Sequence, residues 1–405
     1  MFFEILLFVL LGILFGFVTG LIPGLHPNTI FTLTLSLAFI FAGFPIQFIL
    51  AFVVSLAVSN TFFDFIPAIL FGAPEEDSAL STLPGHRFLL KGRGYEAIFL
   101  ATMGGLGVMF LTVLSLPALF YYLPIIYTII KPMMHIILSL VVVWMVFMEK
   151  KHFSALSVFL LSGIFGFITL NSLPSEQMMF PAFTGLFGLS TILVSIMTRV
   201  RIPSQKIQKD VKGDWLKGSL TGWLAGLLAG LLPGIGSSQA GIIAAQALKA
   251  KTREFLIALG GINTSNIFFT FIVFYVIGKT RSGAVWMISQ VIDHFTFNDV
   301  CLLIIVGILT SLISALFTIK VSRLLLNRMK NLNYSKMMTF TFLMLITLVI
   351  LFSGFLGLLI SITGMFLGLL TISLGIKRTH LMGFLLFPTI MYFSGLNPLF
   401  LQMFW

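Results

Sequence analysis

The feature that most constrains this chain is the length of its uncharged stretches. Residues 5–63 contain no Asp, Glu, Lys or Arg, and further uncharged runs cover 97–130, 219–248 and 337–376. A bilayer core is crossed by about 20 apolar residues in a helix, so each run is long enough to span a membrane once or more. The runs lack the polar–apolar alternation of membrane β-strands. The sequence therefore predicts an all-α polytopic membrane protein.

Composition supports this class. Of 405 residues, 58% are hydrophobic and only 9% are charged, too few to cover a soluble domain of this size. The net charge of +11 arises from scattered basic residues, the first of which is Arg87. Basic residues collect in cytoplasmic loops of membrane proteins, so the charge reports topology and does not indicate nucleic-acid binding.

The N-terminal residues and the single cysteine each support one further expectation. The sequence begins Met-Phe-Phe-Glu, without a basic region or a small-residue cleavage site, so we expect a retained segment and no signal peptide. A single cysteine, Cys301, excludes an intramolecular disulfide and a cysteine-clustered metal site. We expect Cys301 to be a small apolar filler.

The chain divides into two similar halves. Gly16-x3-Gly20-x2-Pro23-Gly24 recurs as Gly226-x3-Gly230-x2-Pro233-Gly234, an offset of 210 residues at every position. Further on, Ser59-Asn60-Thr61-Phe62-Phe63 recurs as Ser265-Asn266-Ile267-Phe268-Phe269, an offset of 206. Two matches in the same order at nearly the same offset indicate duplication. We predict a first membrane repeat at 1–198, a polar cytoplasmic linker at 199–217 and a second repeat at 218–405.

Charge predicts that the second repeat is inverted relative to the first. Both flanks of the first Pro-Gly motif lack basic residues, and both flanks of the second are basic, so each motif is expected at the tip of a re-entrant helical hairpin. The first hairpin would enter from outside, where the N-terminus lies, and the second from the cytoplasm. About five spans then follow in each half, an odd number, which gives the repeats opposite topology. The expected spans are 46–72, 97–121, 132–148, 153–170 and 177–198, then 255–278, 299–319, 337–353, 355–376 and 380–402.

The two hairpin tips are the first candidate site. Proline and glycine interrupt a helix and free backbone N–H and C=O groups, which at membrane depth must be buried in protein or line a wet cavity. Helix N-termini there would favour an anion, and freed carbonyls would suit a cation. A structural kink is the alternative, and His26 is equally well explained as a packing residue. The candidate positions are Pro23, Gly24, His26, Asn28 and Thr29 at the first tip, and Pro233, Gly234, Gly236, Ser237, Ser238 and Gln239 at the second.

A second constellation lies downstream of each tip. Asp64 is the only acid between residues 5 and 71, and an intramembrane carboxylate is a functional candidate that would bind a coupling cation or carry a proton. A buried structural acid is the alternative. Amide and hydroxyl oxygens nearby would suit Na⁺. The candidates in the two halves are Asn60, Thr61 and Asp64, and Asn263, Ser265 and Asn266, with Thr264 between them.

A polar segment between Gly72 and Gly94 is the third candidate. Thr82, His86 and Arg87 are expected to contact an anion, whereas a solvated cytoplasmic loop is the alternative. No Walker motif, nucleophile elbow or metal-spaced His/Asp/Glu cluster occurs in the sequence, so a primary pump and an enzyme are both disfavoured.

These motifs together resemble the large membrane subunit of tripartite tricarboxylate transporters, the TctA family. The resemblance rests on the Pro-Gly motif in each half, on Gly72-Ala73-Pro74…Ser81-Thr82-Leu83-Pro84-Gly85…Lys91-Gly92…Ala97, and on Arg378-Thr379-His380-Leu381-Met382-Gly383. The chain would be a short, divergent member, since Pro84 stands where the family carries Asp. The resemblance implies a secondary permease for small carboxylates, coupled to Na⁺ or H⁺ and needing no other cofactor. It also implies the plasma membrane of a prokaryote, with a small membrane subunit and an extracytoplasmic binding protein as partners.

Two other functions remain open from sequence. A polyprenyl-phosphate or other lipid-phosphate translocase would also use inverted halves with Pro-Gly tips, with basic residues beside an apolar groove. A structural membrane protein without transport is the third hypothesis, and it predicts that substitutions at the tips change only stability.

Overall fold

The computed structural model describes residues 2–22, 44–71, 82–172, 175–197, 203–208, 211–231, 240–241, 244, 248–280, 282–292, 294–328 and 334–397. Every regular element in these segments is helical, and eight helical stretches are long and apolar enough to cross a membrane. The predicted all-α polytopic class is therefore confirmed. The spanning stretches are Phe2–Leu21, Ile46–Leu70, Gly94–Phe147, His152–Asn171, Met178–Met197, Thr252–Ile277, Phe297–Arg328 and Met338–Leu374.

The elements of the first half begin with the long N-terminal helix and end before the linker. They are α1 (Phe2–Leu21), α4 (Ile46–Phe63), α5 (Phe65–Phe71), α6 (Thr82–Leu90), α7 (Gly94–Ile130), η1 (Lys131–Met133), α8 (Met134–Phe147), α9 (His152–Ser172), α10 (Ser175–Phe183), η2 (Thr184–Leu189) and α11 (Ser190–Met197). Those of the second half are α12 (Trp215–Leu231), α14 (Thr252–Ile277), α15 (Gly283–Val291), α16 (Phe297–Arg328), α17 (Tyr334–Leu374), η4 (Arg378–Met382) and α18 (Gly383–Phe393).

Helix boundaries follow local chemistry. Gly354 takes φ 62° and ψ −160°, so α17 breaks at the position that separates the expected spans 337–353 and 355–376. Gly278, also at positive φ, ends α14, and the hydroxyl of Ser282 accepts the N–H of Val285 at 3.3 Å to start α15. These stops lie where the sequence changes from apolar runs to glycine and polar residues.

Three boundaries differ from the sequence expectation. The spans 97–121 and 132–148 form one helical run, Gly94–Phe147, because the 3-10 turn η1 joins α7 directly to α8. Part of the expected loop 73–96 is helix α6, whose Leu89 is fully buried. The predicted linker ends at 217, yet α12 begins at Trp215, where Asp214 Oδ1 accepts the N–H of Lys217 at 3.1 Å.

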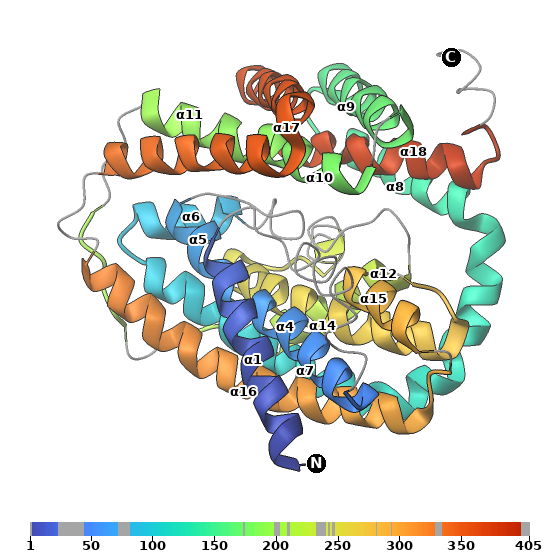
Figure 1. The fold of residues 1–405 in the computed structure, drawn as a ribbon. Coiled ribbons are helices and arrows are strands. Elements are labelled where there is room, and N and C mark those ends of the chain that lie inside the picture. Colours follow the sequence, from blue (N-terminus) through green and yellow to red (C-terminus); the bar gives the residue numbers. More distant parts are fainter. Residues whose placement is uncertain are drawn as a thin grey trace.

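The helices lie in two layers (Figure 1). One layer holds α1, α4, α5, α6, α7, α12, α14, α15 and α16, and the other holds α9, α10, α11, α17 and α18. The run from α7 into α8 passes from the first layer to the second. An apolar cluster joins the layers, with contributions from Leu138, Phe159, Ala225, Leu259 and Leu386.

Each layer contains elements of both sequence halves. In the first layer α4 packs on α1 of its own half and on α16 of the other, and α14 packs on α12 and on α7 in the same way. In the second layer α9 packs on α18 and η4, and α17 packs on α10, η2 and α11. The two halves are therefore interleaved across shared cores.

Burial separates central helices from peripheral ones. The most apolar windows of α14 and of the α4–α5 stretch are each 89% buried, against 22% for α17 and 28% for α1. Leu351 and Phe355 of α17 are each 72% exposed, which suits a helix facing lipid. Most of the predicted polar site residues in the described segments lie on the central pair.

Candidate functional site

The two downstream constellations meet where α4 and α14 cross. Oγ1 of Thr61 on α4 lies 3.3 Å from Oγ1 of Thr264 on α14, and both residues are buried. Each hydroxyl also lies within hydrogen-bond distance of a backbone carbonyl in its own helix. Thr61 is 2.8 Å from the carbonyl of Val58, and Thr264 is 3.3 Å from that of Gly260. Polar residues 203 positions apart in the chain thus share one buried centre.

Asp64 lies beside this crossing. It occupies the junction between α4 and α5, and its carboxylate oxygen Oδ2 accepts the side-chain N–H of Asn263 at 3.4 Å. Asp64 is 3% exposed and Asn263 is 4% exposed, so this acid and its amide partner are both removed from solvent. The predicted intramembrane carboxylate is therefore in contact with the predicted amide of the other half.

Asn60 extends the centre toward α1. Its Nδ2 donates to Oγ1 of Thr19 at 3.1 Å, and both side chains are buried. Thr19 was absent from the sequence candidates. Its position inside the Gly16–Gly20 spacing, three residues after Gly16, was the available signal, since that motif had to pack closely on α4.

The remaining members of the second-half constellation have different surroundings. Ser265 directs its hydroxyl to the carbonyl of Ile262 at 3.2 Å and lies against Gly226 of α12. Asn266 is half-buried, unlike its counterpart Asn60. The structure thus brings Asn60, Thr61, Asp64, Asn263 and Thr264 together, and places Ser265 in the packing contact between α12 and α14.

Glycines set the spacing of these helices in both halves. A Cβ built on Gly16 would lie 1.8 Å from Oγ of Ser59, and one on Gly226 would lie 1.9 Å from Oγ of Ser265. One turn further, Gly20 faces Phe63 and Gly230 faces Phe269, at 2.7 and 2.8 Å from the side-chain Cβ. Because no side chain larger than hydrogen fits, these glycines allow the close approach of α1 to α4 and of α12 to α14.

The predicted tip residues Pro23, Gly24, His26, Asn28, Thr29, Pro233, Gly234, Gly236, Ser237, Ser238 and Gln239 lie outside the described residues. The helices leading to the tips are described up to Ile22 in the first half and Leu231 in the second.

The third candidate segment forms the helix α6. Nδ1 of His86 donates to the backbone carbonyl of Ile69 at 3.0 Å, so the imidazole ties α6 to α5. Burial lowers the pKa of His86 below its usual value, against a smaller opposite effect of this hydrogen bond. Arg87 is exposed, and Thr82 is the first residue of the helix. His86 therefore has a packing partner, while the proposed anion contact of all three residues stays a prediction.

The glycine turn after α6 holds the linker between the halves. Oε1 of Gln205 accepts the N–H of Gly94 at 2.9 Å, and its Nε2 donates to the carbonyl of Leu89 at 2.9 Å. The N–H of Lys206 donates to the carbonyl of Gly92 at 2.8 Å. Gly92 adopts φ +74°, and a Cβ there would lie 2.9 Å from the carbonyl of Ser204, so a glycine is required.

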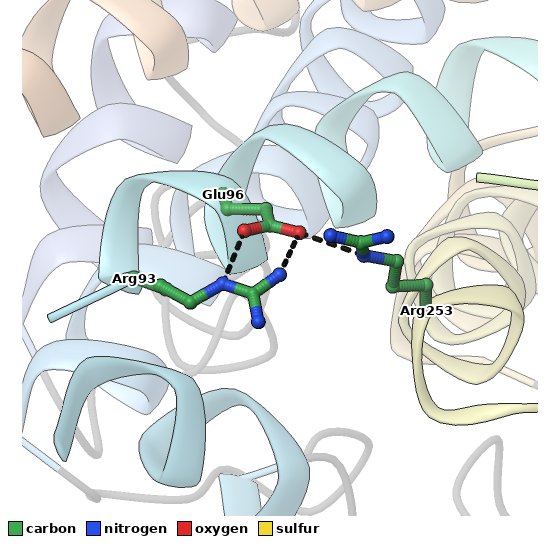
Figure 2. Close-up of polar contacts among 3 residues, drawn as sticks. All are labelled: Arg93, Glu96 and Arg253. Atoms are coloured by element: carbon green, nitrogen blue, oxygen red, sulfur yellow. Dashed lines mark hydrogen bonds and ion pairs between the residues drawn. The ribbon is translucent and has the colours of Figure 1, made fainter. Parts of the chain in front are cut away.

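An ion-pair cluster around a buried carboxylate joins the starts of α7 and α14 (Figure 2). Glu96 is fully buried and accepts two hydrogen bonds from Arg93, both at 2.6 Å, and one from Nε of Arg253 at 2.8 Å. Nearby, Nζ of Lys217 lies 3.3 Å from the carboxylate of Glu254. Sequence reasoning missed this cluster, because Arg93 and Arg253 looked like ordinary loop charges.

The chemistry available at the α4–α14 crossing is that of oxygen donors around one carboxylate. Among the described residues no group of three His, Cys, Asp or Glu side chains is close enough to hold a metal ion. One acid with hydroxyl and amide oxygens suits a proton or a hard monovalent cation better than a soft transition metal.

Apolar helices around a buried polar centre define a polytopic membrane protein. The sequence matches the tripartite tricarboxylate transporter TctA family over residues 6–383, and the chain belongs to that family. A curated relative, the Uncharacterized protein MJ1079 of Methanocaldococcus jannaschii, is 30% identical over 354 residues, which are 84% of this chain and 88% of that protein. No solved structure matches the chain. The resemblance inferred from the sequence motifs is confirmed, and the family is a transporter family, not one of enzymes.

Proposed function

We propose that this protein is a secondary, ion-coupled permease for small organic anions such as di- and tricarboxylates. The observation that carries the proposal is the meeting of Asp64 with Asn263, next to the Thr61–Thr264 contact. A carboxylate at a helix junction in the apolar interior is a candidate functional group, because burying an acid there is costly. Asp64 is the proposed site of the coupling Na⁺ or H⁺.

The proposed anion site lies at the two Pro-Gly tips, which follow α1 and α12. An anion is repelled by a carboxylate and favoured by positive charge, and the described crossing of α4 and α14 carries the acid Asp64 and no basic side chain. Backbone N–H groups at the tip helix starts would supply hydrogen-bond donors without a charged side chain. Cation at Asp64 and anion at the tips would then neutralise each other within the membrane.

Alternating access is proposed to arise from inverted repeats. The contacts of Gly16 with Ser59 and of Gly226 with Ser265 support duplication, because the same packing joins equivalent residues of both halves. A further pair agrees, since Gly105 faces Phe62 and Gly307 faces Phe268. Two copies of one unit in opposite orientation have two nearly equivalent arrangements, one open to each side.

Family membership also bears on partners and location. The TctA family is the large membrane subunit of tripartite transporters, and this subunit works with other subunits. We propose a small membrane subunit and an extracytoplasmic binding protein as those partners, the prokaryotic plasma membrane as the location, and an N-terminus outside. The lipid-phosphate translocase alternative gains no support from the family match.

Uptake by the purified full chain in proteoliposomes tests the proposal. A labelled di- or tricarboxylate should accumulate under an imposed Na⁺ or H⁺ gradient. Asp64→Asn should abolish the gradient dependence while the protein stays folded. Asp299→Asn is the matched control, because Asp299 is an acid at the start of α16 that bonds Thr296 in an exposed position. Gradient-driven uptake that persists unchanged in Asp64→Asn would contradict the role of Asp64, and movement of a polyprenyl phosphate with no carboxylate uptake would favour the translocase.

A further inference from the structure

A second titratable cluster lies at one end of the second layer, away from the α4–α14 crossing. There the turn between α8 and α9 meets the segment between α17 and η4. The N–H of Lys377 donates to Oε2 of Glu149 at 3.2 Å, and Nζ of Lys151 donates to the carbonyl of Leu374 at 2.6 Å. This joint connects the two sequence halves, since Glu149 and Lys151 belong to the first and Lys377 to the second.

His380 lies inside the joint. It is 1% exposed, and its backbone carbonyl accepts the hydroxyl of Ser162 on α9 at 3.1 Å. Neither ring nitrogen makes a hydrogen bond to any described residue. The nearest acid atom is Oε2 of Glu149, 3.6 Å from Nε2, which is an ion-pair distance but too long for a hydrogen bond.

Few charged groups of the described residues surround the His380 imidazole, and Arg378 is held by hydrogen bonds to other residues. Arg378 lies two residues before His380 and donates to the carbonyl of Phe187 at 3.2 Å, to Oγ of Ser190 at 2.7 Å and to Oγ1 of Thr191. The described parts of η2, α11, α18 and the end of α17 present no acid to the imidazole. The charged or titratable groups of the elements packed there are Glu149, Lys150, Lys151, His152, Lys377 and Arg378.

Protonation of His380 would create an imbalance of donors and acceptors. A neutral imidazole has one N–H donor, whereas an imidazolium has two donors and a positive charge. The carboxylate of Glu149 faces Nε2, so the second donor, at Nδ1, would stay buried without an acceptor. A buried unpaired donor is costly, so the charged ring is better solvated outside the joint.

We propose that His380 and Glu149 form a proton-binding latch. The latch holds the α8–α9 turn against η4 while His380 is neutral, and it releases η4 when the imidazole takes up one proton from solvent. Because η4 leads directly into α18, release frees the start of α18 from α9. This site is independent of the coupling role proposed for Asp64.

The lowered pKa of His380 agrees with this geometry. Burial lowers the pKa of His380 below its usual value, and the nearby Glu149 carboxylate opposes that effect only in part. A group whose pKa is lower in the closed state than in the open state drives opening as the pH falls below its open-state pKa.

Hydrogen–deuterium exchange of the purified full chain in detergent, followed across pH 4.5–8, tests the latch. After correction for intrinsic rates, amides of residues 377–383 should exchange faster below pH about 6.5, by up to about tenfold per pH unit for uptake of one proton. His380→Gln, which stays neutral, should lose this acid dependence. His152→Gln is the matched control, since His152 is the exposed first residue of α9, and it should keep the wild-type profile.

Glu149→Gln gives a second test that does not depend on His380→Gln folding. Loss of the carboxylate charge removes the one group that stabilises the imidazolium in the closed joint, so acid opening should become larger than in the wild type. An acid dependence that is the same in the wild type and in His380→Gln overturns the proposal. So does a Glu149→Gln profile with less acid opening than the wild type.

Discussion

Oγ1 of Thr61 and Oγ1 of Thr264 lie 3.3 Å apart in the protein interior, although each belongs to a different half of the chain. The contact fixes the level at which α4 crosses α14. It also determines which polar groups share the centre, since Asp64 and Asn263 are then close enough to bond. The crossing is therefore the place to test how the halves are joined.

Cysteines at the two threonine positions should form a disulfide. In a Cys301→Ser background, Thr61→Cys with Thr264→Cys places two sulfur atoms where hydroxyls now touch, and mild oxidation should link them. If α4 and α14 move apart during transport, the link should block carboxylate uptake until a reductant is added. Peptide mass spectrometry and liposome uptake measure the two effects.

The control for this pair is Thr61→Cys with Thr270→Cys. Thr270 also lies on α14, but its hydroxyl is 3.2 Å from that of Ser282, away from the crossing. The control should stay reduced. A disulfide in the control and none in the Thr61–Thr264 pair would contradict the crossing described here.

Adding a methyl group at Gly226 should destabilise the fold in a way that a second change repairs. The new Cβ of Gly226→Ala would lie 1.9 Å from Oγ of Ser265, and overpacking of this kind costs about 1–3 kcal/mol. Ser265→Gly removes the obstructing side chain, so the double variant should recover most of the lost thermal stability. Unfolding temperature in detergent measures this, with Ser265→Gly alone as the reference.

The equivalent change in the first half should be repaired less well. A Cβ on Gly16 would lie 1.8 Å from Oγ of Ser59 but also 2.7 Å from the backbone carbonyl of Leu56, which no side-chain change removes. Gly16→Ala with Ser59→Gly should therefore stay less stable than its Gly226 counterpart. Equal recovery in both halves would show that the helices can shift to accommodate the methyl group.

Glu96→Gln should lower stability, because Arg93 and Arg253 both bond a fully buried carboxylate. The arginine side chains are 32% and 41% exposed, so water still solvates them after the charge is lost. We expect a cost of about 1–3 kcal/mol, below that of breaking a fully buried pair. The unfolding temperature of the purified protein measures this cost.

Protonation of His86 should lower the free energy of unfolding of the protein at acid pH. Burial lowers the pKa of His86 in the folded protein. The stabilisation from its neutral ring is therefore fully present above pH 6.5, the usual histidine pKa, and is lost as the pH falls toward the lowered folded-state pKa. His86→Gln retains a donor for the carbonyl of Ile69 but does not titrate. The variant should show a smaller drop in unfolding temperature between pH 8 and pH 5 than the wild type.

His152→Gln supplies the comparison for this pH dependence, because His152 is exposed. It should follow the wild-type curve. A His86→Gln curve with the same slope as that of the wild type would assign the acid sensitivity to other groups.

Much of the fold follows from sequence pattern. The uncharged runs predicted that these segments are helical, because backbone groups in a bilayer can be satisfied only inside a helix or a closed barrel. Several bounds differed, since α16 continues to Arg328 and Gly94–Phe147 is one helical run. The break at Gly354 lies at the boundary between the expected spans 337–353 and 355–376. Helix α6 was not visible, since its stability comes from burial of Leu89 and from the bond of His86 to Ile69, both of which are tertiary contacts.

The candidate site was only partly accessible from sequence. Asn60, Thr61, Asp64 and Asn263 were identified because polar groups in an apolar run are rare and costly. Their pairing across the halves depended on the crossing of α4 and α14, which no local pattern specifies. Thr19 was missed although it lies within the Gly16–Gly20 spacing, because its partner Asn60 is known only from the packing of α1 on α4.

The sequence by itself determined the class of the protein, the approximate spans and the residue types available for binding, because hydropathy and breaks in apolar runs are local properties. Only the tertiary structure decided which of those residues meet. Glycine contacts such as Gly226 with Ser265 set how closely neighbouring helices approach. The buried charge of Glu96 is satisfied by one partner from each half, Arg93 and Arg253. Such pairings depend on packing between distant segments, and packing is a property of the assembled helices.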